Sequence, residues 1–180
     1  MRPVWRGDSG GAPRRPSVHQ AVRGLRRDAP LSARAVALCA AGSVVLADQL
    51  TKWWAVSSLR VHPIRLFGDL LELHYVTNPG AAFSMLQGAG AFIALIAVAL
   101  AIFIFVVVRS VELRIEALAL GLVLGGALGN VADRLFRGTG LLDGRVVDWV
   151  DFSFFPAFNV ADSAITIGAA MALIVAFVRE

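Results

Sequence analysis

The chain has 180 residues, of which 57% are hydrophobic and only 17% are charged. This composition is too apolar for an ordinary soluble domain and indicates a protein that lies in a membrane. The single cysteine, Cys39, excludes a disulfide framework and a thiolate metal cluster.

Residues 1–33 are predicted to form a disordered, basic cytoplasmic extension. Eight arginines but only two acids precede residue 35, and the stretch has several prolines and glycines without apolar periodicity. Arginine-rich flanks of membrane segments stay in the cytoplasm, so this end is placed inside. Nucleic-acid binding is not expected, because the extension lacks interleaved aromatic residues and any recognisable module.

The rest of the chain, residues 34–180, is predicted to be one four-span domain of the membrane all-α class. A helix needs roughly 20 mainly apolar residues to cross a bilayer. Four windows meet this requirement, at about 35–56, 89–108, 115–135 and 158–178. The loop 109–114 carries two arginines and is placed in the cytoplasm. The even number of spans brings both termini to that side.

Two longer connections, 57–88 and 136–157, then lie on the outer side. In the first, residues 70–76 have partial strand character and a turn follows at 78–80, which predicts a small extracytoplasmic β-containing segment. The second mixes β-branched and aromatic residues with carboxylates. We predict that it forms an interfacial segment between the third and fourth spans.

Polar side chains gather at the outer ends of three of the four predicted spans. They are Asp48 and Lys52 in the first span, Asn130, Asp133 and Arg134 in the third, and Asn159 and Asp162 in the fourth. An ionisable group in hydrocarbon costs roughly 2.5–3.5 kcal/mol on insertion scales unless it faces protein or water. Several such groups at one depth predict a shared, water-filled cavity near the outer leaflet.

Paired carboxylates in such a cavity can hydrolyse a peptide bond. One carboxylate takes a proton from water while the other donates a proton to the carbonyl oxygen, and their mutual repulsion separates the two pKa values. Asp148 comes ten residues before the fourth span and Asp162 lies near its outer end, so the two can meet. On the residues alone, Asp48, Asp133 and Asp151 remain alternative members of the pair.

Other chemistries fit the sequence less well. A serine–lysine peptidase would have to use Lys52, the only lysine, with Ser163. A metalloprotease is disfavoured because the three histidines are scattered and no H-E-x-x-H motif is present. The serious alternative is a small proton- or ion-coupled transporter. The inner halves of the predicted spans contain only Glu116 as an acid, so a continuous ion path is not supported.

Five stretches of the chain resemble the motifs of the lipoprotein signal peptidase family, also called signal peptidase II. They are Asp48-Gln49-x-x-Lys52, Asn78-x-Gly80-Ala81-Ala82-Phe83, Gly125-Gly126-x-x-Gly129-Asn130-x-x-Asp133-Arg134, Val146-Val147-Asp148-Trp149 and Phe158-Asn159-x-Ala161-Asp162. They occur in the order found in the family, and the similarity covers about residues 34–178.

The resemblance implies an aspartic endopeptidase in which Asp148 and Asp162 are the catalytic dyad. It also implies a set of substrate-binding or supporting residues at the other motif positions. This set consists of Asp48, Lys52, Asn78, Gly80, Asn130, Asp133, Arg134 and Asn159. No metal and no cofactor are implied.

Substrates of this family are prolipoproteins that bear diacylglycerol on the cysteine after the cleavage point, and the enzyme cuts just before that cysteine. The resemblance therefore implies signal-peptide removal in the bacterial cytoplasmic membrane, near the outer leaflet, with lipidated prolipoproteins and membrane lipid as partners. Two features depart from the family pattern. They are the arginine-rich extension and a second carboxylate, Asp151, three residues after Asp148.

Overall fold

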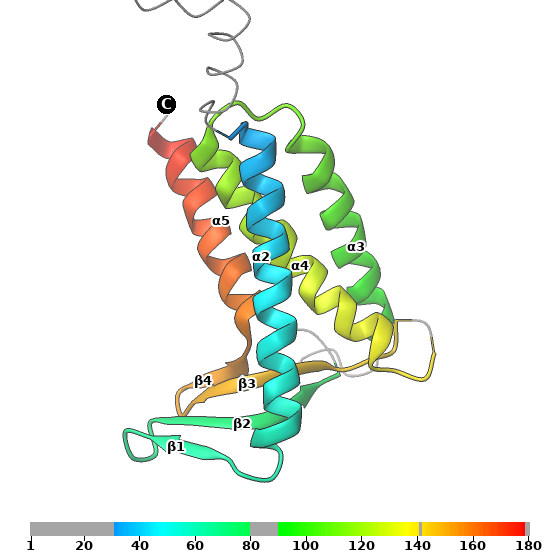
Figure 1. Cartoon of the computed structure of the whole chain (residues 1–180), viewed down its shortest axis with the longest axis vertical. Coiled ribbons are helices and arrows are strands. Elements are labelled where there is room, and N and C mark those ends of the chain that lie inside the picture. The colour runs from blue at the N-terminus through cyan, green and yellow to red at the C-terminus, as the bar shows by residue number, and fades with distance from the viewer. Residues whose placement is uncertain (1–30, 80–89, 141, 179–180) are drawn as a thin grey trace, which may run out of the picture. The chain divides into compact units, whose positions relative to one another are not determined.

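The computed structural model describes residues 31–79, 90–140 and 142–178 (Figure 1). Most of the predicted extension and Gly80 lie outside the described residues. The elements, in chain order, are α2 (Ala33–Trp54), the π-helical turn η1 (Ala55–Leu59), β1 (Ile64–Leu66), β2 (Leu71–Asn78), α3 (Gly90–Val107), α4 (Arg114–Phe136), β3 (Val146–Phe152), β4 (Phe155–Phe158) and α5 (Val160–Val178).

Helix α2 is built to pack against α4 along one stripe of small and polar residues. Ser32 caps its N-terminus, where the hydroxyl accepts a hydrogen bond from the backbone N–H of Ala35 at 3.2 Å. The buried residues of α2 recur every three or four positions, as one helical face requires. They are Ala37, Ala41, Val44, Asp48 and Lys52.

Glycines on α4 allow its neighbours to approach closely. A Cβ atom at Gly121 would lie 2.5 Å from the carbonyl oxygen of Ala37, and one at Gly125 would lie 2.7 Å from that of Ala41. On another side of α4, a Cβ atom at Gly126 would collide with the carbonyl oxygen of Ala161 in α5. Small residues let membrane helices pack at such short range, so α4 is the central helix against which α2, α3 and α5 pack.

The two outer connections form a single antiparallel sheet in the order β1-β2-β3-β4. Strand β2 pairs with β3 from Leu71 opposite Phe152 to Asn78 opposite Val146. The sequence predicted a sheet only in the first connection and an interfacial segment in the second. The second connection instead supplies β3 and β4, because its β-branched and aromatic residues complete the ladder that β2 begins.

The sheet packs against η1 and the end of α2 through a small apolar cluster. Ala55, Leu59 and Val147 are buried there. The rings of Trp54 and Trp149 meet edge to face, with centroids 5.6 Å apart. This contact fixes β3 against α2, and β3 carries Asp148.

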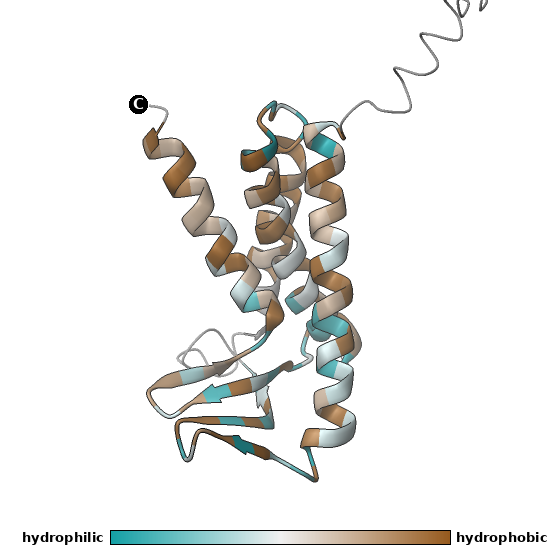
Figure 2. Ribbon diagram, turned by 60° about the vertical axis from the view of Figure 1, so that its left-hand side comes forward, coloured by the Kyte–Doolittle hydropathy of each residue, from teal (hydrophilic) through white to brown (hydrophobic). Residues whose placement is uncertain are grey.

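Three helical segments are long and apolar enough to cross a membrane among the residues that the structure describes: Ala33–Leu59, Arg114–Phe136 and Val160–Val178. Hydrophobic residues cover most of their length (Figure 2). The second predicted span overlaps α3, whose described apolar stretch is Leu95–Val107. The membrane class and the small sheet are thus confirmed, whereas the span at 89–108, and with it the total of four spans, stays a prediction.

The close contact at Gly125 predicts a stability loss on substitution. In Gly125→Ala the new methyl group would lie 2.7 Å from the Ala41 carbonyl oxygen and from Val44 Cβ. Overpacking of this kind costs about 1–3 kcal/mol, so thermal unfolding of the detergent-purified variant should occur at lower temperature. Gly42→Ala is the matched control, since a Cβ atom at Gly42 has nothing within 4 Å. An equal loss in both variants would contradict the packing explanation.

Candidate active site

A cavity of about 660 Å³ opens between the helices and the sheet. One part of its wall is polar and the rest is apolar. The polar residues are Asn78 from β2, Asn130 and Arg134 from α4, Asp148 from β3, and Asp162, Ser163 and Thr166 from α5. The structure therefore brings together side chains from four separate segments, and Asn130, Arg134 and Asp162 are those that the common depth along the spans had grouped.

Asp148 is the more deeply buried of the two carboxylates predicted to form the dyad, with 2% of its surface exposed. Its Oδ1 accepts a hydrogen bond from Nδ2 of Asn159 at 2.6 Å. Burial, aided by the nearby charge of Asp162, raises the pKa of Asp148 to about 7, although hydrogen bonds from Asn159 and Asn78 act in the opposite direction. Asp148 can therefore hold a proton near neutral pH.

Asp162 lies in the first turn of α5, where several N–H groups point at it. Nδ2 of Asn130 donates to its Oδ1 at 2.8 Å. The backbone N–H of Asn159 donates to its Oδ2 at 3.2 Å, and Oδ1 of Asn159 accepts from the backbone N–H of Asp162 at 2.9 Å. This reciprocal pair is an N-terminal cap of α5. Asn159 thus contacts both carboxylates.

A cluster of four charges, three of them fully buried, lies beside the cavity. Nζ of Lys52 is 2.8 Å from Oδ2 of Asp48 and 3.0 Å from Oδ2 of Asp133. It also donates to Oδ1 of Asn130 at 2.9 Å. Nε of Arg137, a partly exposed side chain, donates to the other oxygen of Asp133 at 2.8 Å, so two cations face two anions. We call Asp48, Lys52, Asp133 and Arg137 the charge cluster.

The charge cluster also holds backbone segments next to the predicted dyad. Oδ1 of Asp48 accepts from the backbone N–H of Ala161 at 2.9 Å, at the start of α5. Oδ2 of Asp133 accepts from the backbone N–H of Val147 at 3.0 Å, in the residue before Asp148. The predicted supporting residues therefore fasten both of the segments that carry the carboxylates.

Arg137 was not among the residues predicted for the site. The sequence could have indicated Arg137 because it lies one helical turn after Asp133, a spacing that allows an ion pair. Gln49 was also missed as a contact: its Nε2 donates to Oδ2 of Asp48 at 3.2 Å and to Oδ1 of Asp133 at 3.2 Å.

Asp151 is separated from the cavity although it is close to Asp148 in sequence. Its carboxylate lies 3.7 Å from Nε2 of His74, and its side chain is 36% exposed. Glu72 is its register partner on β2. In residues 31–79, 90–140 and 142–178, no group of three or more His, Cys, Asp and Glu side chains is placed to hold a metal ion.

Comparison with known proteins now identifies the family. Residues 40–178 match the model of a family described as signal peptidase (SPase) II. The chain belongs to the signal peptidase II family. The match confirms the resemblance inferred from the five motifs, and the chain is therefore a peptidase. Nothing in the comparisons supports the transporter alternative.

Relatives and solved structures agree with this assignment. A lipoprotein signal peptidase of Rhodococcus jostii is 41% identical over 94% of this chain and 80% of its own. One of Streptomyces coelicolor is 40% identical over 87% of this chain and 74% of its own. A bacterial membrane enzyme solved by the in meso method at 2.3 Å resolution superimposes with a TM-score of 0.68, at 29% identity over 79% of this chain and 87% of that enzyme.

The raised pKa of Asp148 predicts how the stability of this peptidase depends on pH. The folded-state pKa of about 7 exceeds the ordinary value of 3.8, so folding becomes less favourable as pH rises between these values and the cost is complete above pH 7. Asp148→Asn removes the buried charge while keeping an oxygen acceptor for Asn159. At pH 8 the variant should unfold at a higher temperature than the parent, and its free energy of unfolding should be larger by up to a few kcal/mol.

The same difference should shrink at pH 5, where Asp148 of the parent is mostly protonated. Thermal unfolding of parent and variant in detergent, measured at both pH values, checks this. A variant that is destabilised equally at both would show that burial of the charge at position 148 has no cost.

Proposed function

We propose that the peptidase uses an aspartic mechanism, with Asp148 and Asp162 as its catalytic residues. Members of the signal peptidase II family remove signal peptides from prolipoproteins, and this chain does so as a member. The observation that carries the aspartic assignment is that the two carboxylates line one cavity and share Asn159 as a hydrogen-bond partner.

The environments of the two carboxylates suit different roles. Asp148 is buried and its pKa is raised to about 7, so it keeps a proton and donates it to the carbonyl oxygen of the substrate. Asp162 accepts hydrogen bonds from N–H donors at both of its oxygens, so both oxygens are oriented as acceptors. It takes a proton from the water whose oxygen bonds to the carbonyl carbon.

Collapse of the resulting tetrahedral intermediate completes the reaction. The bond between carbon and nitrogen breaks, the departing amine receives the proton held by Asp162, and Asp148 recovers its proton from a hydroxyl of the intermediate. Both carboxyl groups then return to their starting states, and no further reactant is needed.

The serine–lysine alternative is disfavoured by the same contacts. The three donor positions of the Lys52 ammonium meet Asp48, Asp133 and Asn130, so all of its N–H groups are already engaged. Ser163 lines the cavity, but its hydroxyl donates to the carbonyl oxygen of Asn159 at 3.0 Å. Ser163 and Lys52 are therefore not arranged as a nucleophile with its base.

The apolar part of the cavity supports a lipid-bearing substrate. It is lined by β4 and by the outer part of α5, including Phe155, Phe158, Ile165 and Ile167. Phe155 and Ile167 are each more than half exposed, which places apolar surface at the mouth of the cavity. We infer that the diacylglyceryl chains of the prolipoprotein lie there, in contact with membrane lipid, while Asn78, Asn130 and Arg134 face the peptide.

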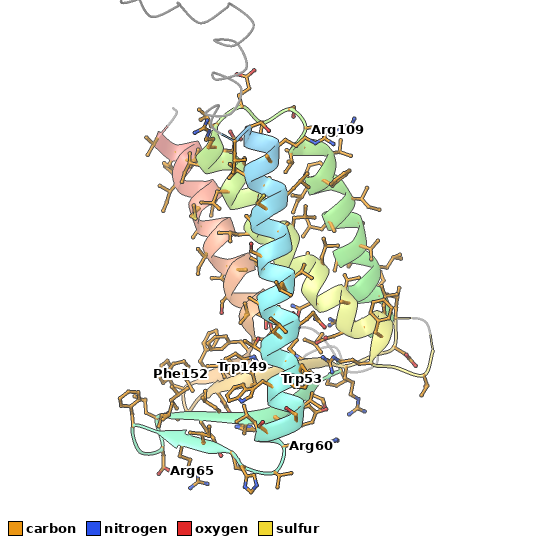
Figure 3. All side chains as sticks on the ribbon, in the orientation of Figure 1. Trp53, Arg60, Arg65, Arg109, Trp149 and Phe152 are labelled. Carbon is orange, nitrogen blue, oxygen red and sulfur yellow. The ribbon has the colours of Figure 1, made fainter. Side chains whose placement is uncertain are left out.

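The eight arginines that precede residue 35 support an active site at the outer leaflet. The start of α2 and Arg109 lie at the end of the helices opposite the sheet, whereas Arg60, Arg65 and the two tryptophans Trp53 and Trp149 lie at the sheet end (Figure 1 and Figure 3). Arginine-rich loops stay in the cytoplasm and tryptophans gather at membrane interfaces. With α3 as a fourth span, both termini are then cytoplasmic and the sheet is extracytoplasmic.

Substitution of the carboxylates tests the aspartic assignment. Asp148→Asn and Asp162→Asn should each lower cleavage of a diacylglyceryl-modified prolipoprotein by at least about 10³-fold, because each removes one of the two proton transfers. Asp151→Asn, on the same strand as Asp148 but outside the cavity, is the control and should stay within about twofold of the parent. Cleavage by purified protein in liposomes is the measurement. Substantial activity in either of the first two variants would move the chemistry to another pair.

The pH profile is a second test. Since Asp148 must be protonated to donate, kcat/KM should fall as pH rises above about 7 and approach a tenfold loss for each further pH unit. Asp151→Asn should show the same alkaline limb as the parent. A rate that is constant from pH 6 to pH 9 would contradict the acid role of Asp148.

A further inference from the structure

We propose that Lys52 is a positioning residue that acts on Asp162 through the side-chain amide of Asn130. This inference rests on the dyad proposed above, because it concerns how one member of that dyad is held. Its basis is a continuous row of contacts, from Nζ of Lys52 to Oδ1 of Asn130 at 2.9 Å and from Nδ2 of Asn130 to Oδ1 of Asp162 at 2.8 Å.

The chemistry of lysine decides which way the Asn130 amide points. An ammonium group has three donors and no acceptor, so the atom of Asn130 that faces it must be the oxygen. The amide nitrogen then faces Asp162 and donates to its carboxylate. A flipped amide would set its NH₂ group against the ammonium and its oxygen against the carboxylate, which are two repulsive contacts.

Lys52 is itself held in place, so it can impose this orientation. Its side chain is fully buried, and its two other acceptors are carboxylate oxygens of Asp48 and Asp133 at 2.8 and 3.0 Å. Three acceptors thus match its three donors. Arg137 balances the second negative charge of the cluster. The charges around Lys52 are therefore neutralised, and the ammonium stays in this position.

The oxygen of Asn130 also connects Lys52 with the other carboxylate. It accepts a second, longer hydrogen bond from Nδ2 of Asn159 at 3.3 Å. The same Nδ2 atom donates to Asp148 at 2.6 Å, and the amide of Asn159 is oriented because its oxygen accepts from the backbone N–H of Asp162. Two oriented amides therefore present N–H groups to the two carboxylates.

Loss of this orientation should act on the chemical step rather than on substrate binding. Lys52 does not line the cavity, so its removal takes no contact away from the substrate. A reacting group displaced by about 1 Å can lose roughly 100-fold in rate. A positioning role therefore predicts a lower kcat with an unchanged KM.

Asn130→Asp separates positioning from a merely structural role. Aspartate has the shape of asparagine and keeps an oxygen for Lys52, but it presents a second oxygen to Asp162 instead of a donor. At pH 7.5 kcat should fall roughly 10- to 100-fold. As pH falls the new carboxyl group can be protonated and donate to Asp162, so the ratio of parent to variant activity should shrink.

Charged groups on every neighbouring element contribute to that pH response. They are Asp48 and Lys52 on α2, Asp133 and Arg134 on α4, Asp148 on β3 and Asp162 on α5. All of them are present in both proteins, so the difference between the two pH profiles reports on position 130. If Asn130 only holds Lys52 in place, the aspartate of the variant should do this equally well and cleavage should match the parent at every pH. That result would overturn the proposal.

The lysine is tested by a charge-balanced double variant and a single-variant reference. Lys52→Met alone leaves two buried carboxylates against one cation and is expected to fold poorly. Lys52→Met combined with Asp48→Asn leaves Asp133 paired with Arg137, and the asparagine introduced at position 48 keeps an acceptor for the backbone N–H of Ala161. The reference is Asp48→Asn alone, in which Lys52 still holds Asn130.

The double variant should have a kcat roughly 10-fold or more below this reference, with the same KM and the same monodisperse elution from size exclusion. Equal kcat values in the two folded proteins would overturn the proposal. If the double variant fails to fold, the pH-dependent recovery of Asn130→Asp decides. Activity in Asp162→Asn would instead refute the dyad, so failure of the dyad and failure of the positioning role give different results.

Discussion

The buried ammonium of Lys52 is the interaction on which the rest of the structure depends. A charge inside a membrane helix is tolerated only where opposite charge and hydrogen-bond acceptors surround it. Here the acceptors come from two helices, α2 and α4. The carboxylates that pair with Lys52 also accept hydrogen bonds from the backbone N–H groups of Val147 and Ala161. One buried cation therefore fixes two helices to each other and both to the segments that carry Asp148 and Asp162.

The glycines of α4 are what allow this cluster to form. Gly121, Gly125 and Gly129 are spaced four residues apart and face α2. At the first two, helix backbone fills the space that a side chain would take. At Gly129 the carboxylate of Asp48 fills it, because a Cβ atom there would lie 2.6 Å from Oδ2. The same close packing that joins the helices thus leaves room for the charge beside the cavity.

The sequence predicted the site more fully than it predicted the sheet. Depth along each span could be counted from the chain, so the meeting of Asp48, Asn130 and Asp162 near one level followed from helix geometry. The pairing of β2 with β3 joins residues 68 to 81 positions apart, from Asn78 with Val146 to Leu71 with Phe152, and no local pattern specifies such a partner. The exclusion of Asp151 from the cavity depends on that pairing, which sets it opposite Glu72. Arg137 was missed because it follows the last predicted apolar turn, although it lies one turn beyond Asp133.

The position of Asn130 explains how Lys52 can help to orient a pair of carboxylates that must share one proton. An ammonium in direct contact with both would favour two ionised groups and remove the acid that the reaction needs. Because the Asn130 amide lies between them, Lys52 orients the N–H group that faces Asp162 while its own charge stays farther from that carboxylate. Among the influences on the pKa of Asp148, burial and the charge of Asp162 come first, and the charge of Lys52 is the smallest. The arrangement therefore combines a rigid, oriented site with a carboxyl group that keeps its proton near neutral pH.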